Sequence, residues 1–289
     1  MTAQVAVGVD GSQESLAAAR WAAREAELRK VPLRLVRVAE RPGDTAELPY
    51  DGDDCGGYDR DGRAGAAVLR EAEAWVRAAH PGVEVFTGQA LGRAGAELTA
   101  AANESDLLVL GSRGLDGLRG FLLGSVSLRV AGAARRPVAL VRAGARGAES
   151  GGEILVGVDL IHPCDALLAF AFAVASRGGR SLHFLNCWTL PPSYGRGAPV
   201  NPGLVEDMCT HRVKGLGDLL EPWRRRYPEV GTRVESVLGG ASGRLVTAST
   251  QASLVVVGRR TTRTPSHLGH VAHALLHHSP VGVAVVPVR

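Results

Sequence analysis

The chain repeats itself, and this repeat constrains the fold more than any other feature of the sequence. Three segments of the first half recur in the same order in the second: VAVGVD at 5–10 as ILVGVD at 154–159, DLLVLG at 106–111 as SLVVVG at 253–258, and PVALV at 137–141 near PVGVAV at 280–285. Such self-similarity indicates two copies of one folding unit. We expect a first domain at 1–143 and a second at 153–289, joined by a small, polar linker at 144–152.

Short β-branched runs alternate with longer Ala-rich stretches in each half. In the first half we expect strands near 4–10, 33–39, 83–88, 106–111 and 137–142, and helices near 13–30, 62–80, 91–104 and 125–134. The strand segments are apolar nearly throughout, which is typical of a parallel sheet covered on both faces. This pattern predicts an α/β fold with two doubly wound five-stranded parallel sheets. Such sheets bind ligands beyond the carboxyl ends of the strands, where the strand order reverses.

Composition excludes several classes of function. The longest apolar run, 166–175, is too short to span a bilayer, and residues 1–12 do not resemble a signal peptide, so we expect a cytoplasmic protein without a membrane partner. A net charge of +4 with 4% aromatic residues gives no support for nucleic-acid binding. The cysteines lack metal or redox spacing and are expected to be free thiols: Cys55, Cys164, Cys187 and Cys209.

Two segments depart from the regular alternation. Residues 40–61 are acidic, and Asp51 and Asp53 match the first two ligand positions of an EF-hand. Cys55 occupies the next ligand position and no glutamate follows at the twelfth, so we expect a surface loop without a metal. The helix expected at 165–177 is apolar on all sides, which predicts burial on more than one side, under an interdomain or intersubunit contact.

Glycines gather after the fourth expected strand, in the sequence GSRGLDGLRGFLLGS at 111–125. There is no Walker lysine, but glycine lets the backbone approach a ligand and point its amides at an anion. We expect Ser125 to be the N-cap of the following helix, whose free amides favour a phosphate. Asp10, at the end of the first strand, would face the same crevice and could accept from ribose hydroxyls or hold Mg²⁺.

The combination of GVDGS at 8–12 with G-x2-G-x9-G-S at 111–125 resembles the ATP-binding branch of the universal stress protein family, and the resemblance covers essentially the whole chain. It implies an adenine nucleotide alpha hydrolase-like fold with strand order 3-2-1-4-5, and a homodimer formed through the fifth strand. It also implies ATP in the first half, alone or with Mg²⁺. The residues that would line this site are Gly8, Asp10, Val38, Gly111, Ser112, Arg113, Gly114, Gly117, Gly124, Ser125 and Val126.

The second half departs from this pattern. Asp159 is kept, but Leu160 and Ile161 stand where the first half has Gly-Ser. In the later loop Thr261 replaces the second glycine, and Pro265 offers no amide proton, so we expect an impaired backbone cradle. A degenerate structural copy and a second nucleotide site both remain open. The candidate residues of that second site are Gly157, Asp159, Gly258, Arg259, Arg260 and Gly269, with Arg263 as a further cation.

Histidines cluster near the end of the second half, at His267, His270, His273, His277 and His278. His273 and His277 have the i, i+4 spacing that can hold zinc, but no cysteine or acidic ligand lies nearby in sequence. We therefore expect a helix surface and no metal.

No motif for catalysis is present: the chain lacks a nucleophile elbow, a paired-carboxylate motif and a Walker lysine. This favours binding and regulation over enzymatic turnover. Three hypotheses follow. The first is an ATP-binding stress or signalling protein in which the nucleotide biases the conformation or the choice of a protein partner of a dimer. The second is a slow ATPase using Asp10 and Mg²⁺. The third is a nucleotide-free dimerisation scaffold.

Overall fold

The structure, a computed structural model, describes residues 3–39, 56–112, 124–144, 152–162, 164–190, 202–261 and 268–288. The described chain falls into two compact units, residues 3–144 and 152–288. Each unit is an α/β fold built on a parallel sheet. No helix in these ranges has the length and apolar character needed to cross a membrane.

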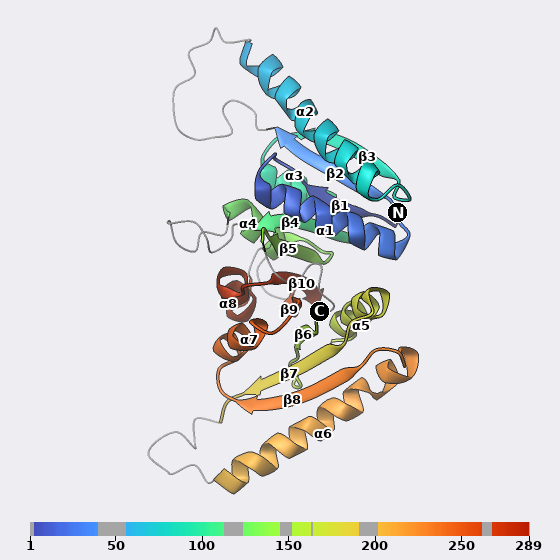
Figure 1. Cartoon of the computed structure of the whole chain (residues 1–289). Helices are drawn as coiled ribbons and strands as arrows, with labels where there is room; N and C mark the ends of the chain where they lie inside the picture. The colour runs from blue at the N-terminus through green and yellow to red at the C-terminus, as the bar shows by residue number, and fades with distance from the viewer. Residues whose placement is uncertain are drawn as a thin grey trace, which may run out of the picture. The chain divides into compact units, whose positions relative to one another are not determined.

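The first unit alternates strands and helices in the expected order (Figure 1). Its elements are β1 (Val5–Gly8), α1 (Gln13–Arg29), β2 (Leu33–Ala39), α2 (Gly56–Ala79), β3 (Val85–Leu91), α3 (Ala94–Asn103), β4 (Leu107–Ser112), α4 (Ser125–Ala133) and β5 (Val138–Arg142). The strands are parallel and lie in the order β3-β2-β1-β4-β5, which confirms the expected topology. The order reverses between β1 and β4, so a ligand crevice is expected at their carboxyl ends.

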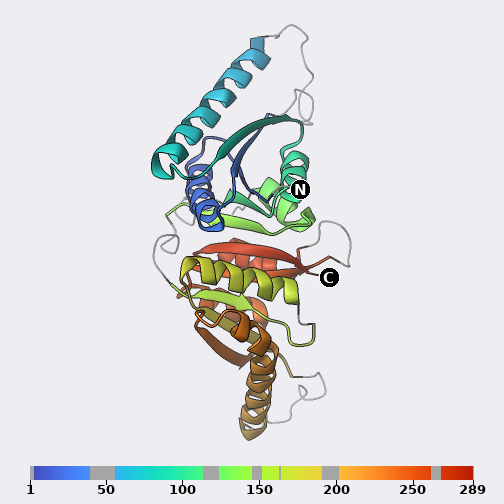
Figure 2. The same ribbon diagram turned by 90° about the vertical axis from the view of Figure 1, so that its right-hand side faces the viewer.

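Helices cover both faces of this sheet. α1 and α2 lie on one face, with α3 and α4 on the other (Figure 2). Val5, Ala6 and Val7 of β1 have no solvent exposure, because both faces of this central strand are covered. The core therefore has two layers, one on each side of the sheet, as the continuous apolar strands predict.

Local signals set the ends of the helices. α1 begins at Ser12, whose hydroxyl accepts from the amide of Ser15, and ends at Lys30 with a left-handed φ of 56°. α2 begins at Gly56, several residues before the expected start at 62. Residues 56–61 of the segment expected to be a surface loop thus belong to α2. The rest of the acidic segment, 40–55, lies outside the described residues.

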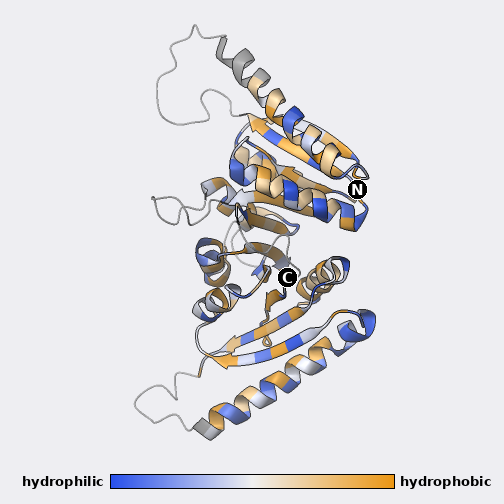
Figure 3. Cartoon of the chain, viewed as in Figure 1, coloured by the Kyte–Doolittle hydropathy of each residue, from blue (hydrophilic) through white to orange (hydrophobic). Residues whose placement is uncertain are grey.

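The second unit repeats this plan. Its elements are β6 (Ile154–Gly157), α5 (Asp165–Gly178), β7 (Leu182–Trp188), α6 (Pro202–Arg226), β8 (Thr232–Leu238), α7 (Ala241–Ser249), β9 (Leu254–Arg260), α8 (His270–His278) and β10 (Gly282–Val288). The strands are parallel in the order β8-β7-β6-β9-β10, so β6 and β9 correspond to β1 and β4. In both units the long helices α2 and α6 alternate hydrophilic and hydrophobic bands (Figure 3).

The apolar helix α5 is buried on one face. Its buried residues follow helical spacing and are Leu167, Leu168, Ala171, Phe172, Val174 and Ala175. Ala166, by contrast, is exposed, so the expectation of burial on more than one side is wrong. Phe172 packs against Phe184, Trp223 and Tyr227 at ring distances of 5.6, 5.9 and 5.6 Å. This aromatic cluster accounts for an apolar helix face, and the intersubunit or interdomain contact stays a prediction.

Candidate functional site

The turn after β1 is organised by a carboxylate. Oδ1 of Asp10 accepts from the amide of Ser12 at 2.9 Å and from its hydroxyl at 2.6 Å. Gly11, between them, has a φ of 87°, a left-handed conformation that L side chains rarely adopt. The turn leads directly into α1 and places Asp10 at the carboxyl end of the central strand. Gly8 is the last residue of β1, and a Cβ there would lie 2.7 Å from a methyl group of Leu110, which would have to shift.

Asp10 is held in its ionised form. Partial burial would raise the pKa of this carboxyl, but hydrogen bonds, first of all those from the hydroxyl and the amide of Ser12, together outweigh burial and hold the pKa below its ordinary value. In the part of the chain that the structure describes, no arginine, lysine or histidine forms an ion pair with Asp10. The described residues of the first unit therefore present a negative charge at the sheet edge without a paired cation.

The end of β4 packs against the start of α1. A Cβ on Gly111 would lie 2.5 Å from the carbonyl carbon of Glu14, so only glycine fits here. Ser112 is buried and its hydroxyl donates to the carbonyl of Val141 in β5. The hydroxyl of Ser127 in α4 donates to the carbonyl of Gly111 at 3.4 Å. These contacts bring the first turns of α1 and α4 to the same crevice between β1 and β4.

Gly124, not Ser125, is the N-cap of α4, so the expectation for Ser125 is wrong. Gly124 has a φ of −60° and a ψ of 138°, its carbonyl accepts from the amide of Leu128, and no side chain caps the helix. Ser125 is the first helical residue and is exposed, while Val126 is half-buried. A Cβ on Gly124 would meet no atom within 4 Å. No described side chain therefore caps the first amides of α4.

Val38 lies in β2, where it pairs with Ala90 of β3. The register of β1 with β2 ends at Val36, so Val38 extends past the end of β1 toward the same edge as Asp10. The structure thus brings Gly8, Asp10, Val38, Gly111 and Ser112 to one edge of the sheet, with the start of α4 beside them. Arg113, Gly114 and Gly117 lie outside the described residues.

In the second unit the equivalent carboxylate has a cation. Nη2 of Arg260, at the end of β9, lies 2.7 Å from Oδ2 of Asp159, and Nδ1 of His162 lies 3.2 Å from the same oxygen. Partial burial would raise the pKa of Asp159. The hydrogen bonds from Ile161 and His162 and the charge of Arg260 have the opposite effect and together hold the pKa below its ordinary value. The sequence places Asp159 and Arg260 among the candidate residues of a second nucleotide site but does not predict that they pair with each other.

The turn after β6 also differs in its backbone. The amide of Ile161 donates to Oδ1 of Asp159 at 2.9 Å, as the amide of Ser12 does to Asp10. Leu160, however, does not share the positive φ of Gly11, since Lys30 is the only described non-glycine residue with one. α5 begins at Cys164 without a side-chain cap. The second turn therefore keeps its carboxylate but loses the glycine conformation and the serine cap.

The remaining candidates of the second unit are spread over this edge. Gly157 ends β6, where a Cβ would lie 3.0 Å from Leu245, and Gly258 in β9 is exposed. Arg259 is 6% exposed, and burial lowers the pKa of its guanidinium. Gly269 is the N-cap of α8, with nothing within 4 Å of a Cβ, like Gly124. Arg263 lies outside the described residues.

The histidines of α8 lie side by side. The ring centroids of His273 and His277 are 4.4 Å apart, and those of His277 and His278 are 6.2 Å apart. Burial, followed by the charges of His277 and His278, lowers the pKa of His273. Among the described residues there is no group of three side chains that could hold a metal ion. His267 is outside them.

Comparison with known proteins identifies the family. The model of the universal stress protein family matches twice, at residues 1–142 and 152–287. A universal stress protein of Mycobacterium tuberculosis (strain CDC 1551 / Oshkosh) is 33% identical over 309 residues, which cover 98% of this chain and 95% of the relative. Another, from strain ATCC 25618 / H37Rv, is 32% identical over 288 residues, 97% and 96% of the two chains.

Solved structures share the fold over the full length. A universal stress protein from Archaeoglobus fulgidus DSM 4304 aligns with a TM-score of 0.72 at 18% identity and covers 98% of both chains. A protein of unknown function from Pseudomonas aeruginosa PAO1 aligns with a TM-score of 0.62 at 17% identity, covering 99% and 93%. With two matches to one family model and relatives along its whole length, this chain belongs to the universal stress protein family and carries two tandem domains of it.

Proposed function

We propose that the first unit binds ATP, alone or with Mg²⁺, and that the bound nucleotide regulates the choice of a protein partner by a cytoplasmic homodimer in the stress response. One observation carries this proposal. Asp10 stands ionised at the β1–β4 edge without a cationic partner among the described residues, whereas the equivalent Asp159 is paired with Arg260 at 2.7 Å.

The residues around this edge suit the parts of an adenine nucleotide. The Asp10 carboxylate can accept hydrogen bonds from ribose hydroxyls or hold Mg²⁺. The uncapped amides at the start of α4, from Ser125 and Val126, suit a phosphate group. Val38 offers apolar surface beyond the end of β1 for the base. Arg113, Gly114 and Gly117 are assigned to the phosphates by the family resemblance alone.

We propose that the second unit is a structural copy that does not take up nucleotide. Arg260 already holds the carboxylate that would meet the ribose, and Arg259 is buried. The expected stoichiometry is therefore one nucleotide per chain, in the first unit.

The test is to release any small molecule from purified, untagged protein with acid, to identify it by mass spectrometry, and to titrate ATP calorimetrically with and without Mg²⁺. The key variant is Gly124→Asp. Asp is a favourable N-cap and a side chain here meets nothing within 4 Å, so the fold should persist while the carboxylate occupies the helix amides. Gly82→Asp is the matched control, because it adds the same charge at an equally open position before β3, at the opposite end of the strands.

One nucleotide per chain, lost in Gly124→Asp and kept in Gly82→Asp, would support the proposal. Two per chain would show that the second unit is also a nucleotide site. If no nucleotide is bound and ATP gives no heat of binding, the proposal is wrong and the hypothesis of a nucleotide-free dimerisation scaffold is favoured. A hydrolysis rate above buffer that disappears in Asp10→Ala would assign the slow ATPase instead.

A further inference from the structure

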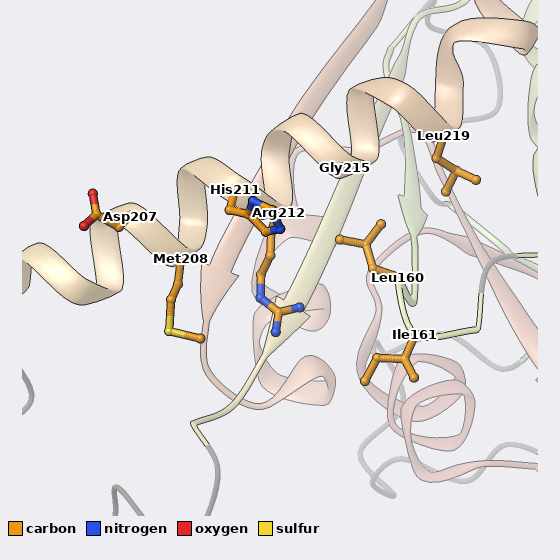
Figure 4. A pocket seen from close by; sticks show the side chains of 8 residues that line it. All are labelled: Leu160, Ile161, Asp207, Met208, His211, Arg212, Gly215 and Leu219. Atoms are coloured by element: carbon orange, nitrogen blue, oxygen red, sulfur yellow. The ribbon is translucent and has the colours of Figure 1, made fainter.

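The second unit contains a cavity that the nucleotide hypothesis does not use. It has a volume of about 660 Å³ and lies between α6 and the turn that follows β6 (Figure 4). α6 contributes Met208, Arg212, Gly215 and Leu219, which recur at helical spacing on one face. Pockets of this size hold small organic molecules, for which about 300–1,000 Å³ is usual.

The turn supplies an apolar wall. Leu160 and Ile161 line the cavity at the positions where the first unit has Gly11 and Ser12. Ile161 is 75% exposed, the largest exposure among the large apolar side chains of the described chain. A ligand that covered Ile161 would remove this apolar surface from water, which favours binding of a hydrocarbon group.

Arg212 is the only arginine or lysine among the residues that line this cavity. The guanidinium of Arg212 lies 4.7 Å from the ring centroid of Trp188 and reaches into the cavity (Figure 4). Within the described ranges no carboxylate forms an ion pair with Arg212, and the other ionisable residues that line the cavity are Asp207 and His211. Trp188 is buried, and its indole Nε1 has no hydrogen-bond acceptor among the described residues. Arg212 thus offers the cavity guanidinium N–H donors that no described carboxylate engages.

Gly215 keeps the middle of the cavity open. It lies inside α6, where glycine destabilises a helix relative to alanine, and a Cβ there would meet no atom within 4 Å. No steric need of the fold explains this glycine. The missing side chain leaves space between the apolar wall and Arg212.

We propose that this cavity binds a small monocarboxylate with a hydrocarbon body. The body would pack against Leu160, Ile161, Met208 and Leu219, and the carboxylate would accept hydrogen bonds from Arg212. The planar guanidinium presents paired donors that match the two oxygens of a carboxylate. Apolar walls with one cation do not suit the several charges of a nucleotide triphosphate. This inference is independent of nucleotide binding in the first unit.

The test is calorimetric titration of the full chain with sodium decanoate, kept below its micelle-forming concentration, and with decanol as the uncharged probe. Gly215→Leu should fill the cavity: a Cβ at this position meets no atom within 4 Å, and leucine is a better helix former than glycine, so the fold is expected to persist. Urea unfolding of the variant checks that it does. Gly217→Leu is the matched control, because it makes the same change in the same helix, also with nothing within 4 Å, outside the cavity. Arg212→Gln removes the cation, and Arg212→Lys keeps it.

We expect one saturable decanoate site per chain, with affinity reduced at least tenfold by Gly215→Leu and by Arg212→Gln. Gly217→Leu should bind as the unchanged chain does, Arg212→Lys should recover part of the loss, and decanol should bind at least tenfold more weakly. Absence of saturable decanoate binding, or equal binding in the two leucine variants, would overturn the proposal. Displacement of decanoate by ATP would also overturn it and would assign the cavity to a nucleotide.

Discussion

Gly111 and Glu14 are in backbone contact: a Cβ on Gly111 would lie 2.5 Å from the carbonyl carbon and 2.6 Å from the carbonyl oxygen of Glu14. The end of β4 is thereby packed against the first turn of α1, although the two segments are far apart in the sequence. The contact fixes the width of the crevice that Asp10 borders. The neighbouring atoms belong to the backbone of Glu14, which cannot shift as readily as the end of a flexible side chain.

Gly111→Ala should therefore destabilise the first unit by roughly 1–3 kcal/mol or more, as overpacking against a rigid neighbour does. Gly258→Ala is the matched control in the second unit, where a Cβ would lie 3.2 Å from a methyl group of Val288. That side chain can shift, so the loss should be smaller. Urea unfolding measures both, and equal losses would contradict the assigned backbone clash.

The pair formed by Asp159 and Arg260 should contribute little to stability. The two side chains are 48% and 52% exposed, and exposed ion pairs contribute about 0.2–1 kcal/mol. A double-mutant cycle with Asp159→Asn and Arg260→Met should give a coupling energy in that range, falling as salt is added. A salt-independent coupling well above it would mean that the pair is buried in solution.

His183 should make the stability of the second unit depend on pH. Its Nε2 lies 2.9 Å from Glu235 and its Nδ1 lies 2.8 Å from Arg233, which can only donate, so the ring is neutral with the proton on Nε2. Burial, then the charge of Arg233, lowers the pKa of His183 below 6.5, against the opposing effects of Glu153 and Glu235.

As the pH falls through 6.5, the unfolded chain therefore binds a proton that the folded chain does not, and the free energy of unfolding decreases. This loss continues down to the folded pKa. His183→Gln should flatten the dependence in that window, as measured by urea unfolding at several pH values. An unchanged slope would show that another group is responsible.

Cys187 should be a poorly reactive thiol. Burial raises its pKa from 9.0 to about 11, with Arg244 acting in the opposite direction and Glu235 in the same one. Two pKa units leave roughly a hundredfold less thiolate at a given pH, and the thiolate is the reactive form. Alkylation by iodoacetamide at pH 8, followed by peptide mass spectrometry, should be slower by about that factor in the folded protein than in urea. Similar rates in the two states would argue against burial of the thiol.

The fold could be predicted because its determinants are local and repeated. Apolar strands such as 106–111 mark a covered parallel sheet, and the recurrence of the same segments shows that the plan occurs twice. Errors arose at helix ends. Gly124 rather than Ser125 caps α4, since the cap is fixed by backbone dihedral angles and not by the side chain best able to cap. α2 starts at Gly56, before the expected residue 62.

The site was harder to predict where distant residues meet. Asp10 could be placed at the crevice from its position after a strand. Arg260 and Asp159 are about a hundred residues apart in the sequence, and their pairing depends on how the folded strands bring them together. No local sequence pattern predicts such a contact. The role of Gly215 could not be predicted either. The space beside this helical glycine becomes a cavity only because the turn after β6 packs opposite it, which the sequence does not reveal.

The Arg260–Asp159 contact has a consequence for how the two halves respond to their surroundings. In the second half the positive charge that pairs with Asp159 is Arg260, a residue of the same chain. Its effective concentration at the turn therefore does not depend on any dissolved molecule. Under the proposed function the first half obtains the matching interaction only from a dissolved molecule, and its stability therefore rises with the logarithm of that molecule's concentration. The stability of the second half is then independent of the nucleotide concentration, whereas the fraction of the first half that is unfolded falls as that concentration rises.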